Sequence, residues 1–383
     1  MIPFNKPYLT GKETEYIKDA VASGKISGNG KYTQKCQKFF EEKFGFRKAL
    51  LTTSCTDALE MAAILIDIQE GDEVIMPSYT FVSTANAFVL RGARIVFADS
   101  MPNHPNIDTA KLESLITEKT KAIVPVHYAG VACEMDTIME LAAKYNLFVV
   151  EDAAQAIDSY YTGKDGVKRA LGSIGHLAAF SFHETKNIIS GEGGMLAIND
   201  ERFVQRAEVI WEKGTNRSAF FRGEVDKYGW VDIGSSFLPS EVIAAFLWAQ
   251  LENMEDIQRV RKRHWEAYRS GLEIFAKENN IALPWVPDYA TNNGHMFYLV
   301  CENIGQRSAL IEKLRDKNIH PVFHYISLHS SPYYQEKHDG RMLTETDRFT
   351  DCLVRLPLFY ELDGNAVLEA LALETALIEK KIE

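Results

Sequence analysis

The stretch that decides the fold is residues 147–155, LFVVEDAAQ. Four apolar residues in a row, without helical spacing, predict a short buried strand. An amphipathic segment at residues 135–145 precedes it, with Met135, Ile138, Met139 and Ala142 on one helical face. The pair predicts a helix followed by a strand, with Asp152 placed just where that strand ends.

Similar apolar runs lie on both sides of this strand and alternate with helical patterns. They are residues 73–77, 94–98, 122–126, 177–182 and 195–198. This alternation predicts an α/β fold, a mostly parallel sheet with helices on both faces. The runs beginning at Leu177 and Met195 are joined by a glycine-rich stretch without a helix, so we expect that pair to break the parallel pattern.

The pattern changes in the last third of the chain. A long helical region spans residues 239–276, and short strands are expected at 296–300 and 321–324. Helices are expected at 307–317 and 363–380. We therefore expect a large domain at residues 1–254, including an N-terminal segment, and a smaller C-terminal α+β domain at 255–383.

Composition narrows the class of protein. The chain has 383 residues, 46% of them hydrophobic, and a net charge of −11 without a basic stripe, which disfavours disorder and general nucleic-acid binding. Five scattered cysteines without zinc spacing are typical of reduced thiols, and we expect no metal. Neither a signal peptide nor a membrane-spanning run is apparent, so a cytoplasmic protein is expected.

Asp152 and Lys186 form the most informative pair of residues. Ligands of open α/β sheets bind at the carboxyl ends of the strands, and an unpaired carboxylate there is costly to bury. The protonated ring nitrogen of pyridoxal phosphate (PLP) would compensate the buried charge of Asp152. Lys186 lies 34 residues later beside a glycine-rich turn and can form a Schiff base. The alternative is an ordinary strand-end Asp and a solvated Lys.

Three further features favour a phosphate-bearing aromatic ligand. Ser54, Cys55 and Thr56 precede a helical pattern, so their N–H groups can bind phosphate, although a plain helix cap explains these residues better when they are taken alone. The Ser181 hydroxyl can reach the same phosphate. Phe81 follows a strand and can stack on a flat ring, or can simply pack in the core.

Longer motifs give a family resemblance. Residues 151–155 (EDAAQ), 181–187 (SFHETKN) and 191–194 (GEGG) resemble the DegT/DnrJ/StrS family of nucleotide-sugar aminotransferases, and the match extends from Ile2 to Tyr360. The resemblance implies the aspartate-aminotransferase-like fold of PLP enzymes (fold type I). It also implies roles for single residues. Lys186 would bind PLP covalently, Asp152 would pair with the ring nitrogen, Gln155 would lie near the phenolic oxygen and Phe81 would cover the ring. Cys55, Thr56 and Ser181 would bind the phosphate. The role of His183 stays open.

One position departs from the family pattern. Ser236 stands where many relatives carry an Asn that reaches the phosphate in the partner subunit, so the residue that makes this contact is in doubt. The resemblance implies a homodimer with shared active sites. It also implies sugar contacts from Tyr325 and His329, whereas His324 ends an apolar strand and is expected to be structural. Arg217 and Lys227 lie in a loop rich in basic and aromatic residues, which favours binding of the dTDP-sugar, in this subunit's site or the neighbouring one; the alternative is a solvated charged loop.

The resemblance also implies the reaction. Residues 77–93, 125–139, 213–217 and 220–228 resemble the members that aminate C4 of a dTDP-linked sugar. The expected reaction moves the amino group of L-glutamate to dTDP-4-dehydro-6-deoxy-glucose, giving dTDP-4-amino-4,6-dideoxy-galactose for a cell-surface glycan such as O-antigen or enterobacterial common antigen. Alternatives are the gluco 4-epimer, a 3-keto sugar, a dehydratase (disfavoured by Lys186) and a non-catalytic binding or regulatory protein.

Overall fold

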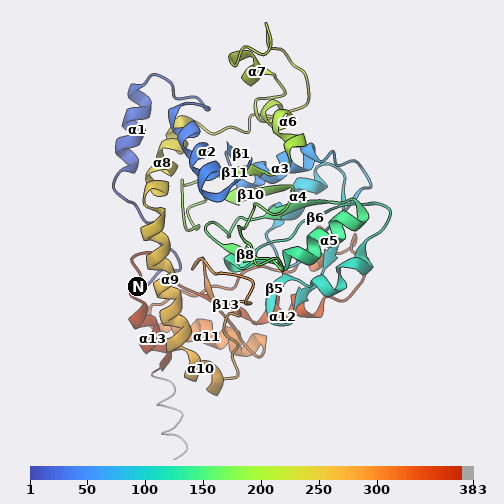
Figure 1. The fold of residues 1–383 in the computed structure, drawn as a ribbon. Coiled ribbons are helices and arrows are strands. Elements are labelled where there is room, and N and C mark those ends of the chain that lie inside the picture. Colours follow the sequence, from blue (N-terminus) through green and yellow to red (C-terminus); the bar gives the residue numbers. More distant parts are fainter. Residues whose placement is uncertain (373–383) are drawn as a thin grey trace, which may run out of the picture.

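The computed structural model describes residues 1–372, and a seven-stranded sheet lies at its centre (Figure 1). The strands follow the spatial order β1-β11-β10-β7-β6-β2-β3. Their bounds are β1 Lys48–Thr52, β2 Glu73–Pro77, β3 Arg94–Ala98, β6 Thr120–Ile123, β7 Phe148–Asp152, β10 Leu177–Ser181 and β11 Gly194–Ile198. The sheet confirms the predicted α/β class.

Strand β11 is the exception to the parallel arrangement. It pairs antiparallel with both β1 and β10, whereas β10, β7, β6, β2 and β3 pair in parallel. This agrees with the expectation for the glycine-rich connection, because a link without a helix returns the chain beside the strand it left. The carboxyl ends of β1, β2, β7 and β10 therefore open at one edge of the sheet.

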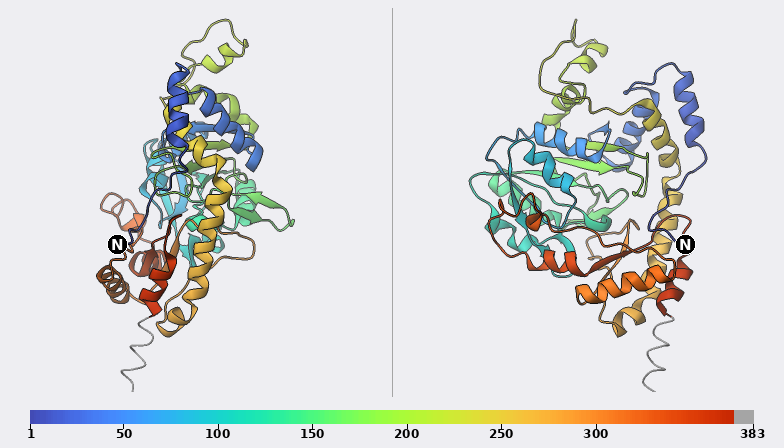
Figure 2. Two further views of the ribbon diagram at one scale, coloured as in Figure 1. Left: turned by 90° about the vertical axis from the view of Figure 1, so that its left-hand side faces the viewer. Right: turned by 180° about the vertical axis from the view of Figure 1, so that it is seen from behind.

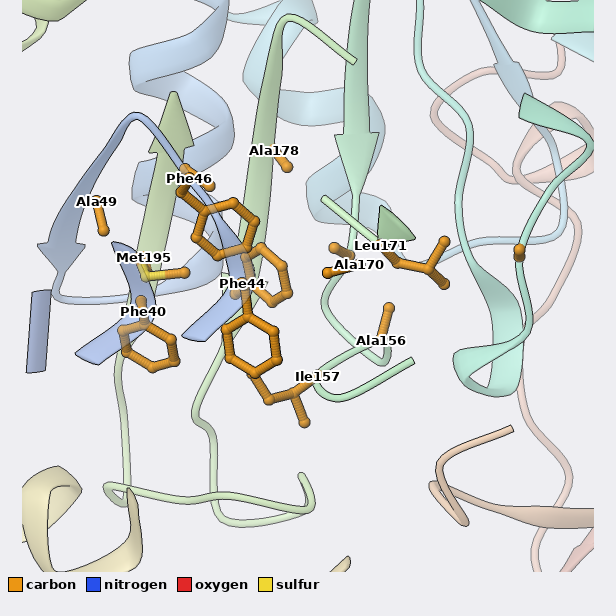
Figure 3. Packing of buried hydrophobic residues seen from close by; sticks show 14 of the residues in the cluster. Phe40, Phe44, Phe46, Ala49, Ala156, Ile157, Ala170, Leu171, Ala178 and Met195 are labelled. Atoms are coloured by element: carbon orange, nitrogen blue, oxygen red, sulfur yellow. The ribbon is translucent and has the colours of Figure 1, made fainter. Parts of the chain in front are cut away.

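Helices cover both faces of the sheet. On one face lie α2 (Lys31–Phe44), α5 (Met135–Tyr145) and α8 (Glu241–Glu252), and on the other α3 (Cys55–Leu65), α4 (Val82–Val89) and α6 (Glu201–Trp211). Neighbouring strand residues alternate between the two cores: Val149 packs on the first face and Val150 on the second. Figure 3 shows Phe40, Phe44 and Phe46 beside Ala178 and Met195 in the first core.

Smaller elements surround this framework. Helix α1 (Glu13–Ala22) packs against α8, and α7 (Arg217–Phe221) projects from the body of the molecule (Figure 1). The remaining elements before residue 250 are β4 Ser100–Met101, β5 His104–Ile107, β8 Tyr160–Thr162, β9 Lys168–Ala170 and the 3₁₀ turns η1 Thr109–Leu115 and η2 Tyr128–Gly130.

The C-terminal third forms a layer below the sheet, reached through the long helix α9 (Figure 2). Its elements are α9 Met254–Gly271, α10 Glu273–Glu278, β12 Phe297–Val300, α11 Ile304–Asp316, η3 Leu328–Ser330, α12 Thr344–Cys352, β13 Leu353–Leu356 and α13 Gly364–Ala372. Residues from Trp265 to Leu371 build a separate hydrophobic cluster there. The boundary expected between residues 254 and 255 stays a prediction.

Three expectations for this region need adjustment. The helical region at 239–276 consists of α8, α9 and α10. The strand expected at 321–324 is reduced to one antiparallel β-bridge between Val322 and Arg355. The final helix is described to Ala372, and the rest of its expected range lies outside the described residues. None of the helices within residues 1–372 has the length and apolar character needed to cross a bilayer.

Candidate active site

A cavity of about 590 Å³ lies where the parallel strands end. Its walls come from the segments after β1, β2, β7 and β10, from the C-terminal layer and from the N-terminal residues Phe4 and Asn5. The cavity thus occupies the sheet edge at which open α/β folds bind ligands. Its size suits a small organic ligand.

Asp152 closes strand β7 at the floor of this cavity. Its carboxylate accepts hydrogen bonds from the Thr84 hydroxyl (2.7 Å) and the Ala154 N–H (3.1 Å), and the residue is 5% exposed. Burial raises the pKa of Asp152, while the Thr84 hydrogen bond and the charge of Lys186 act in the opposite direction. The result is a carboxylate of fixed orientation that gains from a cationic ligand group.

Lys186 lies on the turn between β10 and β11, and its side chain lines the cavity. Its backbone N–H donates to the His183 carbonyl at 2.9 Å, which closes the turn. Burial lowers the pKa of the Lys186 amine, Asp152 raises it and the Arg355 guanidinium lowers it again. A lowered pKa increases the fraction of neutral amine, which is the form that attacks a carbonyl.

The first turn of α3 forms a cradle for an anion. Ser54 caps the helix by accepting the Asp57 N–H at 3.0 Å, so the N–H groups of Cys55 and Thr56 begin the helix at the cavity wall. Thr56 and Ser83 bond to each other through their hydroxyls (2.8 Å), and Ser181 lines the same wall. Burial raises the pKa of the Cys55 thiol, so no thiolate competes for the cradle.

The cradle depends on a glycine behind it. A Cβ on Gly194 would lie 2.3 Å from the Ser54 carbonyl carbon and 2.4 Å from the Cys55 nitrogen. Gly194 thereby allows β11 to support the start of α3 from behind.

Gln155, Phe81 and Tyr325 border another part of the cavity. Gln155 accepts from the Ala129 N–H (2.6 Å) and donates to the Tyr325 hydroxyl (3.0 Å), so its amide is oriented from both sides. Phe81 is 56% exposed and its ring centre lies 6.3 Å from that of Tyr325. An exposed ring at a cavity mouth is available to cover a flat ligand, which core packing would prevent.

The structure brings together Lys186, Asp152, Gln155, Phe81, Cys55, Thr56, Ser181 and Tyr325 around one cavity. It places the other expected residues elsewhere. Arg217, Lys227 and Ser236 are exposed and do not line the cavity. His329 is buried against Ser78, whose hydroxyl lies 2.9 Å from its Nδ1. Contacts of these four residues with substrate or partner stay predictions.

Several cavity residues were not anticipated from the sequence as site residues. His295 lies 2.8 Å through Nδ1 from the Asn187 amide oxygen, and burial holds its pKa well below the usual range, so its ring is neutral. His324, expected to be structural, lines the cavity and stacks on Tyr325 at 3.5 Å. Thr84, Ser83 and Arg355 also line the cavity, and no local motif marks any of them.

A family model described as the DegT/DnrJ/EryC1/StrS aminotransferase family matches residues 7–372. The chain belongs to this family. It is 35% identical over 343 residues to the spore coat polysaccharide biosynthesis protein SpsC of Bacillus subtilis, covering 88% of this chain and 86% of SpsC. It is 33% identical to a GDP-perosamine synthase of Escherichia coli O157:H7 over 96% of both chains. A putative sugar aminotransferase from Streptococcus pneumoniae, solved in its PLP form, superposes with a TM-score of 0.86 at 25% identity over 98% of both chains.

Membership makes the chain a PLP-dependent aminotransferase, and its cavity fits that cofactor. Asp152 is a fixed carboxylate for the ring nitrogen, the α3 cradle offers N–H and hydroxyl donors for the phosphate, and Lys186 is an amine with a lowered pKa. The non-catalytic alternative is therefore set aside.

Proposed function

We propose that this aminotransferase moves the amino group of L-glutamate to C4 of dTDP-4-dehydro-6-deoxy-glucose and forms dTDP-4-amino-4,6-dideoxy-galactose for a cell-surface glycan. The single observation that carries an amino-transfer site is the meeting of Asp152, Lys186 and the α3 cradle in one cavity. The nucleotide sugar is supported by the long sequence stretches that resemble C4-aminating members, and by relatives named as GDP-perosamine synthases. The galacto configuration rests on those stretches alone.

The residues divide the work as follows. When bound, PLP supplies an electron sink that acidifies the hydrogen on the donor's α-carbon. Asp152 keeps the ring nitrogen protonated, and the cradle of Cys55, Thr56 and Ser181 holds the phosphate. The Lys186 Nζ takes the proton from the α-carbon of glutamate and later delivers one to C4 of the sugar. Glutamate leaves as 2-oxoglutarate, whose new oxo oxygen comes from water, and the keto oxygen of the sugar leaves as water, so that water is neither gained nor lost overall.

The nucleotide diphosphate needs cationic partners beyond the two cations of the cavity wall, Lys186 and Arg355. Arg217 and Lys227 lie on the projecting α7 loop, beside the exposed rings of Phe221, Tyr228 and Trp230 (84% exposed for Trp230). We infer that a second copy of the chain receives this loop at its cavity, so that the homodimer shares its active sites. Ser236, on the segment that follows, would reach the partner's cofactor phosphate. Tyr325 and His329 would contact the sugar.

The absorption spectrum of the purified PLP-loaded enzyme tests the first half of this proposal. L-glutamate is expected to convert the PLP form to the pyridoxamine form, and the keto sugar is expected to restore it. The proton–proton couplings of H4 in the product then distinguish the galacto from the gluco epimer. An enzyme that glutamate leaves unchanged would refute the donor, and an equatorial amine at C4 or amination at C3 would refute the product.

Mixed dimers test the shared site. Lys186→Ala and Arg217→Ala chains are each expected to be inactive alone. An equal mixture should recover up to a quarter of wild-type activity. About half of the dimers then contain one chain of each kind, and in each of these one of the two sites combines an intact Lys186 with an intact α7 loop. A sedimentation profile of monomers, or no recovery after subunit exchange, would contradict the proposal.

A further inference from the structure

Arg355 is a cation in the cavity to which neither motif nor family resemblance gave a role. It lies on β13, where Leu353, Val354 and Leu356 are buried and Arg355 alone is half-buried, because its side chain reaches the cavity. The strand is fixed by its pairing with β12, in which Arg355 is opposite Tyr298. The guanidinium is therefore held by a rigid element and not by a mobile loop.

Its hydrogen-bonding capacity is largely unused. In the part of the chain that the structure describes, the buried Nε has no acceptor, and the Nη2 atom meets only the Phe323 carbonyl, at 3.5 Å. No carboxylate lies within ion-pair distance in that same part. A buried N–H on a permanently charged group is costly to leave without an acceptor. The arrangement therefore gains from an anionic ligand.

The surroundings orient this guanidinium and do not neutralise it. The Phe4 ring centre lies 4.5 Å from Cζ, a cation–π contact that covers one face. Phe4 is held in place because Ile2 bonds to both Asn318 and His320 (2.7 and 3.0 Å). Tyr79, Tyr128 and Tyr325 also act on Arg355, and burial raises the pKa of each phenol, so they stay uncharged at neutral pH. The charge of Arg355 is further felt by Lys186, His295 and His324, none of which is an anion.

Position decides which anion fits. The cofactor phosphate has its own cradle at the first turn of α3, where Cys55, Thr56 and Ser181 line the cavity. Lys186, in contrast, does respond to the charge of Arg355. A donor α-carbon must lie at the Lys186 amine, and its carboxylate is one bond away. A diphosphate is separated from the sugar C4 by the whole pyranose ring.

We propose that Arg355 binds the α-carboxylate of the amino donor through its guanidinium, and that Phe4 positions Arg355 for this contact. The inference rests on the proposed function, because it assumes an amino acid as donor. It makes Arg355 a specificity-determining residue for the first half-reaction only. The carboxylate of the departing 2-oxo acid would occupy the same place.

The test separates the two half-reactions by rapid absorbance measurements. Arg355→Gln is expected to raise the glutamate concentration for half-maximal conversion of the PLP form about 10- to 150-fold, the range for charge-assisted hydrogen bonds. The pyridoxamine form should react with the keto sugar within twofold of wild type. Arg355→Lys should recover part of the loss. Glutarate, an unreactive dicarboxylate, should bind the PLP-loaded wild type measurably in calorimetry and Arg355→Gln at least tenfold more weakly.

Arg307→Gln is the matched control. Arg307 also lies in the C-terminal layer and also has a buried Nε without an acceptor, yet it does not line the cavity. Its glutamate dependence should equal that of wild type. Unchanged glutamate and glutarate binding in PLP-loaded Arg355→Gln would overturn the inference, as would a loss confined to the keto sugar, which would assign Arg355 to the diphosphate. If the wild type reacts with no standard amino acid, the proposed function fails as well, so the two failures are distinguishable.

Discussion

Replacement of Gly194 by alanine tests whether β11 sets the position of the phosphate cradle. The added Cβ would meet two backbone atoms, the Ser54 carbon at 2.3 Å and the Cys55 nitrogen at 2.4 Å. Backbone atoms cannot swing aside as the end of a side chain can, so the first turn of α3 must retreat by about 1 Å to reach ordinary contact. Gly194 does not have a positive φ, so the strain is purely steric.

Such a retreat acts on the cofactor first. The N–H groups of Cys55 and Thr56 would miss the phosphate by more than the roughly 0.5 Å that a preorganised site tolerates. We expect Gly194→Ala to weaken PLP binding by at least tenfold and to lower the free energy of unfolding of the apoprotein by about 1–3 kcal/mol. The affinity is measured by titrating apoprotein with PLP and following absorbance, and the stability by urea unfolding.

A matched glycine controls for the mutation itself. Gly364 begins α13, has no positive φ, and a Cβ there would meet its nearest atom at 3.9 Å. Gly364→Ala should leave PLP affinity unchanged. If Gly194→Ala binds PLP within twofold of wild type, the phosphate does not depend on the α3 turn and the cradle has been assigned to the wrong atoms.

Three further outcomes are expected. Thr84→Val removes the hydroxyl donor of Asp152, so the pKa of Asp152 should rise further and the single-turnover rate with glutamate should fall about tenfold, while half-saturation stays within twofold. Lys186→Met should stabilise the apoprotein at pH 7 by about 1 kcal/mol in urea unfolding, since it removes a partly buried cation. Because burial lowers the folded-state pKa of Lys186, this advantage should be complete below that pKa and shrink as pH rises toward the unfolded value; an advantage that grows with pH would contradict the assignment. Glu151→Ala should lower the free energy of unfolding by about 3 kcal/mol in the same assay, because His127 and the N–H groups of Gly172, Ile174 and Gly175 lose their acceptor. A decrease of less than about 1 kcal/mol would refute that role.

The predictable part of the site is the part that parallel strands bring together. Asp152 and Ser181 end neighbouring strands, and Cys55 follows a third, so strand order alone carries them to one edge. Lys186 lies near the same edge because it comes soon after the end of β10, in the connection that returns the chain as β11. The antiparallel β11 was foreseeable for the same reason. In each case a local pattern and one rule of sheet geometry suffice.

The remainder could not be predicted in this way, because it depends on how distant segments pack. Arg355 and His295 come from the C-terminal layer, where no short motif distinguishes a cavity-facing side chain from a buried one. His324 was misjudged because residues 321–324 resemble a strand, although a single bridge at Val322 leaves the following residues free to turn into the cavity. Thr84 lies within helix α4 and belongs to no motif, and its role in the site follows from its hydrogen bond to Asp152.

The cavity combines three ionisable groups whose charged forms are disfavoured by burial. Burial favours the neutral form of Asp152, of Lys186 and of Arg355 alike, and of the three only Asp152 accepts hydrogen bonds that hold its charge. A chain selected for stability alone would replace such residues with apolar ones. Each has a complement in the proposed reactants: a ring nitrogen for Asp152, a carbonyl carbon for Lys186 and a carboxylate for Arg355. Ligands should therefore stabilise this protein in two separable steps, first PLP and then a carboxylate, and only the second step should disappear in Arg355→Gln.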